Sequence, residues 1–355
     1  MVRSMSPRVL LGTGRPRYAR GRVLLRPVAR VRASIVVAAY NEERNIAALL
    51  QSILDQELAA AELHEIIVVA SGCTDATHAE VERVARTDAR IRLLVQGARL
   101  GKVSAINAYL AVRDPSCDVV VICSADVCLH PGCLERLLER FSVEPGLGMT
   151  GGRPMPNNQR DTLLGEVVHI LWELHHERAS QAPKLGEIVA VRGCIMQPLT
   201  SGSPVDEASA EALVEASGHT LRYVPEALVT NHGPENLREY FAQRRRINAG
   251  HYWLKRMCGY EPSTFNWRRV VPLALRRLSL RRPRQSAALV LAAAVEIASR
   301  ITGSVDLRLG RSHAIWAVSD SARPRLELEL ERDIDRRPPR AAQIAPVPSE
   351  RRPGR

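Results

Sequence analysis

Aromatic residues and cysteine motifs are scarce in this sequence, and their scarcity excludes several kinds of protein. Aromatic side chains make up 4% of the 355 residues, so no aromatic-rich surface for recognising nucleic acid is visible. The seven cysteines are odd in number and include no Cys-x-x-Cys pair, which disfavours a secreted disulfide framework and a structural zinc site. We therefore expect a protein of the reducing cytosol.

Two further motifs are missing. The first is Gly-x-Gly-x-x-Gly after the first apolar strand, where a dinucleotide enzyme needs it to bring a pyrophosphate close to a helix. The second is a long apolar segment, because the run from Ala287 to Val295 ends after nine residues at Glu296, short of the roughly 20 that span a bilayer. The sequence therefore predicts neither a dinucleotide-dependent oxidoreductase nor a transmembrane helix.

Acidic residues are absent from two segments of a chain whose net charge of +12 suggests a polyanionic neighbour. Residues 1–32 hold nine arginines and no uninterrupted apolar stretch, which predicts a basic disordered arm and no signal peptide. Residues 263–295 alternate arginines with apolar residues, which is typical of an amphipathic surface that lies on anionic lipid. A helical hairpin packed on the preceding domain explains the same pattern. Its seven arginines are Arg268, Arg269, Arg276, Arg277, Arg281, Arg282 and Arg284.

The middle of the chain alternates short β-branched runs with helical patterns. The expected strand and helix pairs are 34–38 with 42–56, 65–69 with 76–86, 91–95 with 102–112, and 119–123 with 131–141. Apolar strands without polar alternation, each followed by a helix, indicate a parallel sheet covered on both faces. We therefore predict an α/β fold with a Rossmann-like, mostly parallel sheet flanked by helices over 33–260, a basic helical extension over 261–320 and a disordered tail over 321–355.

The residues that follow these strands carry a resemblance to a known family. They read Ala38-Ala39-Tyr40-Asn41-Glu42-Glu43, Gly72-Cys73-Thr74-Asp75 and Ser124-Ala125-Asp126, and Gly101-Lys102, Asp206-Glu207 and Gln243-Arg244-Arg245-Arg246 follow in order. Over roughly 33–255 this order and spacing resemble the family 2 glycosyltransferases with the GT-A fold. The resemblance implies a nucleoside diphosphate sugar donor, bound by Ala39, Asn41, Glu42, Ser71, Asp75, Lys102, Ser124, Gln243 and Arg246.

A metal site is also implied by the resemblance. Asp126 ends a strand, where a carboxylate can bind Mg²⁺ or Mn²⁺ while the diphosphate oxygens complete the shell. His232 is a further metal-ligand candidate. Two departures stand out, because the family's Asp-x-Asp begins here with Ser124 and its Asp-Asp after the second strand is Ala70-Ser71. Without the resemblance, Asp126 is interpreted as a helix cap before Pro131, and Asp75 as a turn residue.

The resemblance also implies a general base for inverting glycosyl transfer. Counting back from Gly218 places Glu207 where the family has its Asp base, and Asp206 is the fallback. A capping pair at the start of a helix over 207–216 is the competing interpretation. Ile247 replaces the Trp of the family's Gln-x-x-Arg-Trp motif, which argues against a processive synthase.

The sequence thus predicts a metal-dependent, inverting, nonprocessive glycosyltransferase. We expect it to transfer a sugar to a hydroxyl of a lipid-linked or glycan acceptor, as a cytoplasmic protein held peripherally on the inner face of the cell membrane, without nucleic acid as a partner. Two alternatives remain at this point: a glycosyltransferase-like scaffold that has lost activity, and a basic nucleic-acid-binding protein.

Overall fold

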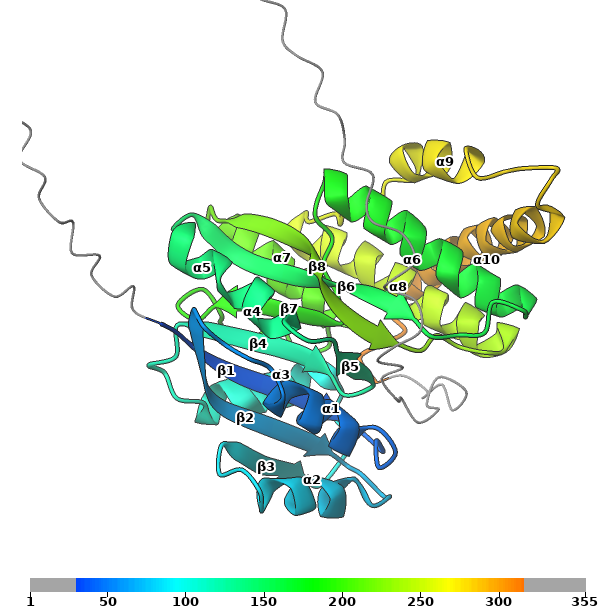
Figure 1. The fold of residues 1–355 in the computed structure, drawn as a ribbon. Coiled ribbons are helices and arrows are strands. Elements are labelled where there is room, and N and C mark those ends of the chain that lie inside the picture. Colours follow the sequence, from blue (N-terminus) through cyan, green and yellow to red (C-terminus); the bar gives the residue numbers. More distant parts are fainter. Residues whose placement is uncertain (1–29, 316–355) are drawn as a thin grey trace, which may run out of the picture.

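The computed structural model describes residues 30–315, which form an eight-stranded sheet flanked by helices (Figure 1). The strand order is β3-β2-β1-β4-β7-β6-β8-β5. The strands are β1 (Val31–Ala39), β2 (Ala61–Ser71), β3 (Ile91–Gln96), β4 (Val119–Ser124), β5 (Val127–Leu129), β6 (Leu147–Pro156), β7 (Ile188–Arg192) and β8 (Thr220–Asn231). Of the predicted basic arm, residues 31 and 32 open β1 and the segment before residue 30 lies outside the described residues, as does the predicted tail over 321–355.

The first four strands run parallel, and each contains the apolar run that predicted it. Val36 of β1 pairs with Ile67 of β2 on one side and with Ile122 of β4 on the other. All three side chains are buried because helices cover both faces of this part of the sheet, which explains the lack of polar alternation. From β4 onward the sheet becomes mixed, since β7 pairs antiparallel with β4 and with β6. The predicted α/β class is confirmed.

The helices form two layers on the sheet and a further group beyond it. They are α1 (Ile46–Leu54), α2 (Thr77–Ala85), α3 (Lys102–Val112), α4 (Cys133–Leu138), α5 (Arg140–Val143), α6 (Leu163–Gln181), α7 (Asp206–Ala216), α8 (Leu237–Cys258), α9 (Trp267–Leu275) and α10 (Pro283–Arg308). Leu49 of α1 and Leu134 of α4 belong to the core on one face of the sheet. Ile106 of α3 and Val214 of α7 belong to the core on the other. The helix predicted over 131–141 forms as two pieces, α4 and α5.

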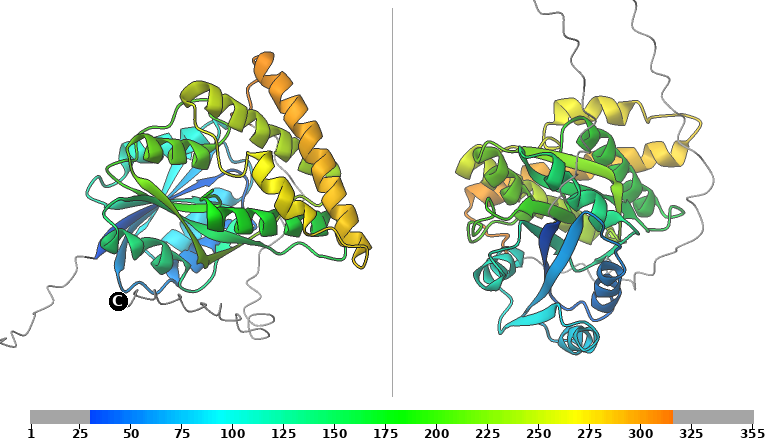
Figure 2. Two further views of the ribbon diagram at one scale, coloured as in Figure 1. Left: turned by 90° about the horizontal axis from the view of Figure 1, so that it is seen from above. Right: turned by 60° about the vertical axis from the view of Figure 1, so that its left-hand side comes forward.

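The predicted helical extension consists of α9 and α10, which pack with α6 and α8 around a separate apolar core (Figure 2). Gly303 lets α10 approach α8 closely, because a Cβ atom at this position would lie 2.9 Å from the backbone nitrogen of Ala249. The Asp306 carboxylate accepts two hydrogen bonds of 2.6 Å from Arg245 of α8. Both contacts hold α10 along α8.

Helix α10 is longer than its apolar run indicates. It passes Glu296 and ends at Arg308, and among residues 30–315 it is the one helix that is long and apolar enough to cross a membrane. The nine-residue apolar run therefore underestimated the length of α10. By length and composition alone, this helix could cross a membrane. A third of its most apolar window, 33%, is buried against the protein. Val290, Ile297 and Ile301 lie on its exposed side.

Candidate active site

A cavity of about 1640 Å³ opens where β1, β2 and β4 end, the sheet edge at which the sequence predicts the site. Most of the predicted residues line it. These are Ala39, Glu42, Ser71, Lys102, Ser124, Asp126, Asp206, Glu207, His232, Gln243 and Arg246. The structure therefore brings together side chains that lie more than a hundred residues apart in the sequence. The strand order, with β4 between β1 and β7, places them at the same edge of the sheet.

Asn41 and Asp75 are predicted donor residues that do not line this cavity. Asn41 has a positive φ of 54°, and its side-chain oxygen accepts a hydrogen bond of 2.8 Å from the backbone N–H of Thr74. Asp75 accepts hydrogen bonds from the backbone N–H groups of Glu43 (3.1 Å) and Thr77 (3.0 Å). Both side chains therefore join the loops after β1 and β2, which agrees with the turn interpretation of Asp75, and their contact with a donor stays a prediction.

Lys102, which lines the cavity, lies between two carboxylates. Its ammonium nitrogen is 2.9 Å from Oδ2 of Asp206 and 2.7 Å from Oε1 of Glu207. It also donates a hydrogen bond of 3.2 Å to the Ser124 hydroxyl at the end of β4. Lys102 is the first residue of α3, and Asp206 and Glu207 open α7, so two helix N-termini meet here.

The three charges shift one another's pKa values. Burial alone would lower the pKa of Lys102, but the two carboxylates outweigh burial and raise it. Burial acts to raise the pKa of Glu207, and the neighbouring ammonium outweighs it, so the pKa of Glu207 lies below its usual value. Burial and the negative charge of Glu207 together raise the pKa of Asp206. Of the two carboxylates Glu207 thus loses its proton the more readily, and a general base must be unprotonated to act.

Two carboxylates form the candidate metal site. Asp126 lines the cavity, and Glu187 lies near enough that burial first, and then the charge of Asp126, raise the pKa of Glu187. No group of three or more His, Cys, Asp or Glu residues that could hold a metal ion occurs among residues 30–315. Carboxylate oxygens suit Mg²⁺ or Mn²⁺, so these two residues fit such an ion if the ligand's diphosphate supplies further oxygens.

His232 also lines the cavity, but other side chains already engage both of its ring nitrogens. Nδ1 lies 2.6 Å from Oδ1 of Asn157. Nε2 lies 3.0 Å from Oε1 of Glu235 and 3.2 Å from Nδ2 of Asn158. A role as metal ligand would require one of these contacts to open, and ligation by His232 stays a prediction.

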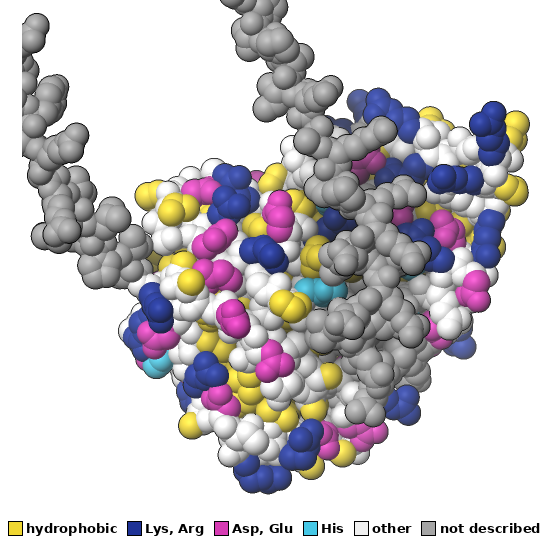
Figure 3. Space-filling model, viewed as in Figure 1, with side chains coloured by type: hydrophobic (Ala, Val, Ile, Leu, Met, Phe, Trp, Pro, Cys, Tyr) yellow, Lys and Arg dark blue, Asp and Glu magenta, His cyan; other side chains and the backbone are white. Residues whose placement is uncertain are grey.

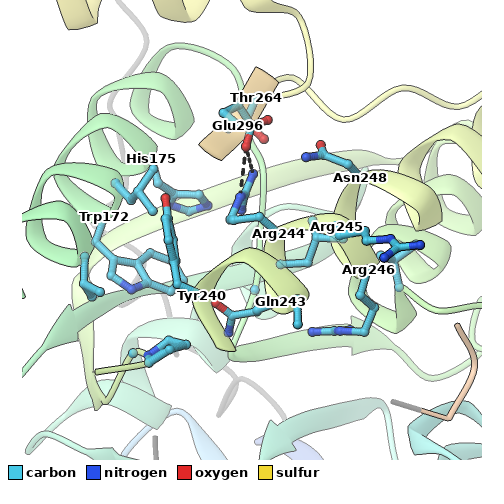
Figure 4. A pocket seen from close by; sticks show the side chains of 18 of the residues that line it. Trp172, His175, Tyr240, Gln243, Arg244, Arg245, Arg246, Asn248, Thr264 and Glu296 are labelled. Carbon is cyan, nitrogen blue, oxygen red and sulfur yellow. Dashed lines mark hydrogen bonds and ion pairs between the residues drawn. The ribbon is translucent and has the colours of Figure 1, made fainter. Parts of the chain in front are cut away.

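The three consecutive arginines of α8, at 244–246, make contacts with two different parts of the protein (Figure 4). Arg244 donates hydrogen bonds of 3.0 and 2.8 Å to Glu296 of α10, and Arg245 pairs with Asp306 of the same helix. Arg246 instead reaches the loop before α7, where it donates a hydrogen bond of 3.0 Å to the carbonyl of Pro204. Arg246 therefore supports the segment that carries Glu207, and its contact with a donor stays a prediction.

Arg99 and Glu187 are among the polar side chains of this cavity that sequence reasoning missed. Arg99 stacks on the Tyr40 ring at 4.0 Å, and it follows β3, so the rule that ligands meet strand carboxyl ends could have found it. Glu187 precedes β7, and its carbonyl accepts a hydrogen bond from the backbone of Ser124. Because β7 runs antiparallel to β4, its start lies at the edge where β4 ends, and the same rule overlooks it. Glu187 also has a positive φ of 62°, a strained backbone for a residue with a side chain.

Comparison with known proteins agrees with this geometry. Residues 34–197 match the model of glycosyl transferase family 2. Relatives described as N-acetylglucosaminyltransferases occur in Bradyrhizobium diazoefficiens, 26% identical over 60% of this chain and 47% of the relative, and in Rhizobium sp. strain N33, 26% identical over 60% and 51%. This chain therefore spans about half the length of the curated relatives it matches.

A solved structure shares the fold. A mannosyltransferase from Pyrobaculum calidifontis in complex with GDP-Man and Mn²⁺ superposes with a TM-score of 0.54 at 21% identity, covering 79% of each chain. The family match therefore places residues 34–197 in glycosyl transferase family 2. The likeness to the mannosyltransferase shows that the two proteins share their fold.

Proposed function

We propose that this protein is a metal-dependent, inverting, nonprocessive glycosyltransferase. It moves a sugar from a nucleoside diphosphate sugar to a hydroxyl of a lipid-linked or glycan acceptor of the cell envelope. The observation that carries this proposal is the contact of Lys102 with both Asp206 and Glu207 in the cavity that Asp126 also lines. A catalytically impaired scaffold is disfavoured, because a base, a cation and a metal-binding carboxylate are all retained.

The base is Glu207. In an inverting transfer it removes the proton of the acceptor hydroxyl while that oxygen attacks the anomeric carbon opposite the leaving diphosphate. Its ionised state is maintained by Lys102, 2.7 Å away. A bound diphosphate competes for the Lys102 ammonium, and any weakening of the Lys102–Glu207 contact raises the pKa of Glu207 toward the value at which a general base works best.

Asp126 and Glu187 would hold the metal. A divalent cation bound there supplies positive charge that stabilises the leaving nucleoside diphosphate. Ser124 replaces the first acid of the usual pair, and its hydroxyl already accepts a hydrogen bond from Lys102. Glu187, the residue before β7, then supplies the second carboxylate of this site. The presence of Mn²⁺ in the related mannosyltransferase complex supports this proposal.

We further propose a peripheral position on the cytoplasmic face of the membrane. The arginines gather over α9 and α10, with hydrophobic side chains between them (Figure 3). Glu296 and Asp306 of α10 are paired with arginines of α8, so moving α10 into a bilayer would separate partly buried ion pairs. A helix that keeps these pairs and rests its exposed apolar side on anionic lipid fits the basic surface better than a spanning helix or a nucleic-acid site.

Turnover of nucleotide sugars tests the proposal. Purified protein is incubated with a panel of UDP- and GDP-sugars and Mn²⁺, and release of nucleoside diphosphate is measured with and without EDTA. We expect release from at least one donor, abolished by EDTA. A panel that yields no release with Mn²⁺ or Mg²⁺ supports the scaffold instead.

A further inference from the structure

The cavity extends past the donor residues into a cleft between α6, α9 and α10, which we call the apolar arm. Most of the residues that line the cavity on these helices are aliphatic or aromatic, and Glu296 and Arg300 of α10 are charged exceptions. The apolar residues include Leu171 and Trp172 of α6, Val270, Val271, Ala274 and Leu275 of α9, and Leu289, Val290, Ala293 and Ile297 of α10. The cavity is thus polar where the strands end and apolar between the helices.

The outer end of the arm lies beside exposed apolar side chains. Leu275 is 58% exposed, Val290 63% and Ile297 61%, and each also lines the arm. Arginines flank this surface, since Arg268, Arg269, Arg276, Arg281, Arg282 and Arg284 are exposed on α9 and on the turn to α10. The outer end of the arm therefore combines exposed apolar side chains with neighbouring arginines, a combination that favours contact with anionic lipid.

The inner end of the arm carries polar atoms that lack partners within the described residues. The hydroxyl of Tyr240 and Nδ1 of His175 are both buried without a hydrogen-bond partner (Figure 4). Burial lowers the pKa of His175 to about 3 and raises the pKa of Tyr240 to about 12, so both side chains are neutral. Buried polar groups are nearly always hydrogen-bonded in native proteins, and a ligand's polar group at this point would satisfy them.

We propose that the apolar arm binds the hydrocarbon chain of the acceptor, with the acceptor's polar head between Tyr240 and the Lys102–Glu207 pair. This assignment rests on the proposed glycosyltransferase function and selects a lipid-linked acceptor over a free glycan. Three observations support it: the aliphatic walls, the continuity of the arm with the catalytic cavity, and the unpaired polar atoms where the two meet. A soluble sugar would gain nothing from the aliphatic walls.

Two neighbouring alanines of α10 allow a matched test. Ala293 lines the arm and Ala294 does not, although both are exposed. Ala293→Trp fills the arm, whereas Ala294→Trp adds the same indole outside it. Binding of n-decyl phosphate and n-butyl phosphate, both below micelle formation, is measured by calorimetry on full-length wild type and on both variants. Circular dichroism and thermal unfolding of the variants confirm that they remain folded.

The expected result is a chain-length effect that only one variant removes. Each methylene group buried in the arm raises affinity by up to about fourfold, so decyl phosphate should bind the wild type at least about 100-fold more tightly than butyl phosphate. Ala293→Trp should lower decyl phosphate affinity about tenfold or more and leave butyl phosphate unchanged. Ala294→Trp should change neither. Equal affinity of the wild type for both probes, or equal losses in both variants, overturns the assignment.

Nucleotide-sugar turnover by the same proteins distinguishes failure of the apolar-arm assignment from failure of the glycosyltransferase function on which it rests. Metal-dependent turnover without a chain-length effect overturns the apolar arm alone. A chain-length effect without turnover of any donor overturns the glycosyltransferase function, and the acceptor assignment with it.

Discussion

Lys102 is the residue on which the candidate site depends most. Its ammonium contacts two carboxylates that burial would otherwise protonate, and it joins the N-terminus of α3 to that of α7. A lysine on a first helical turn is electrostatically unfavourable by itself, since helix N-termini carry partial positive charge. The two carboxylates offset this cost, so a lysine at this position is favourable only when α7 lies beside it.

Replacing Lys102 with methionine should therefore destabilise the protein. Lys102→Met leaves two buried carboxylates without their cation, a change that typically costs about 3–5 kcal/mol in the free energy of unfolding at pH 7. In wild type the pKa of Glu207 is lowered, so its contribution to stability is present above its usual pKa and is lost in acid. In the variant burial raises the pKa of both carboxylates, and their repulsion fades as they take up protons.

Chemical denaturation across a pH series measures this effect. The stability gap between wild type and Lys102→Met should narrow as pH falls from about 8 to about 4, since protonated carboxylates need no cation. Lys102→Arg keeps the charge and serves as the control, with a smaller loss. A gap that stays constant over this range would show that the loss is one of packing and not of charge.

Asp126 is predicted to carry the metal response. Asp126→Ala removes a carboxylate from the cavity, so the Mn²⁺-dependent rise in melting temperature with nucleoside diphosphate should disappear while the melting temperature of the ligand-free protein stays near that of wild type. Thermal shift with UDP and GDP, with and without Mn²⁺, measures this. If the variant responds to metal and nucleotide as wild type does, Asp126 does not bind the metal.

Sequence spacing located some of these residues and could not locate others. The eleven-residue distance to Gly218 singled out Glu207, which lies in the first turn of α7 and contacts Lys102 in the structure. No local sequence pattern indicates that Glu187 belongs to the site. Its place there follows from the antiparallel pairing of β7 with β4, two strands that are far apart in the sequence. The separation of Asn41 from the cavity likewise depends on its tertiary hydrogen bond with Thr74.

At the scale of elements, the strands were more predictable than the later helices. Each of the first four strands is a β-branched run between turns, so local preference and tertiary burial agree. Helix α10 was harder to interpret, because Glu296 and Asp306 interrupt its apolar pattern. Each of these acids is paired with an arginine of α8, so the interruption marks a helix–helix contact and not a helix end.

The exposed side of α10 should hold the protein on anionic membranes. Replacing Ile297 and Ile301 together with glutamate puts two negative charges on this apolar side, which lowers both hydrophobic insertion and attraction to anionic lipid. Co-sedimentation with vesicles containing phosphatidylglycerol should fall at least about tenfold, with wild-type circular dichroism. Val143→Glu is the matched control, because Val143 is exposed on α5 in the core domain.

If the double variant and the Val143→Glu control co-sediment with vesicles to the same extent, membrane attachment through α10 is contradicted. This pair of point substitutions is a better test than deletion of α9 and α10, because the buried residues Leu273, Leu289 and Val295 belong to the core that these helices share with α6 and α8. Deletion would expose that core, and a loss of membrane binding could then not be distinguished from unfolding.

At the scale of the molecule, the sheet edge and the α6–α8–α9–α10 group meet in one cavity. The sheet supplies Ser71, Ser124 and Asp126 at the ends of its strands, and the helical group supplies Gln243, Arg246 and the apolar arm. The sequence predicted these two parts separately, as a donor domain and a basic extension. It could not predict that the extension lines the cavity, because that depends on the packing of α10 along α8 and α6.

The central claim is that Glu207, kept ionised by Lys102, is the base of glycosyl transfer. The most direct test is the rate of transfer by Glu207→Gln with the donor and acceptor that wild type uses, with Asp206→Asn as its neighbour control. We expect transfer by Glu207→Gln to fall about 10²- to 10⁴-fold with nearly unchanged donor binding. Full transfer by Glu207→Gln together with its loss in Asp206→Asn would contradict the claim and assign the base to Asp206.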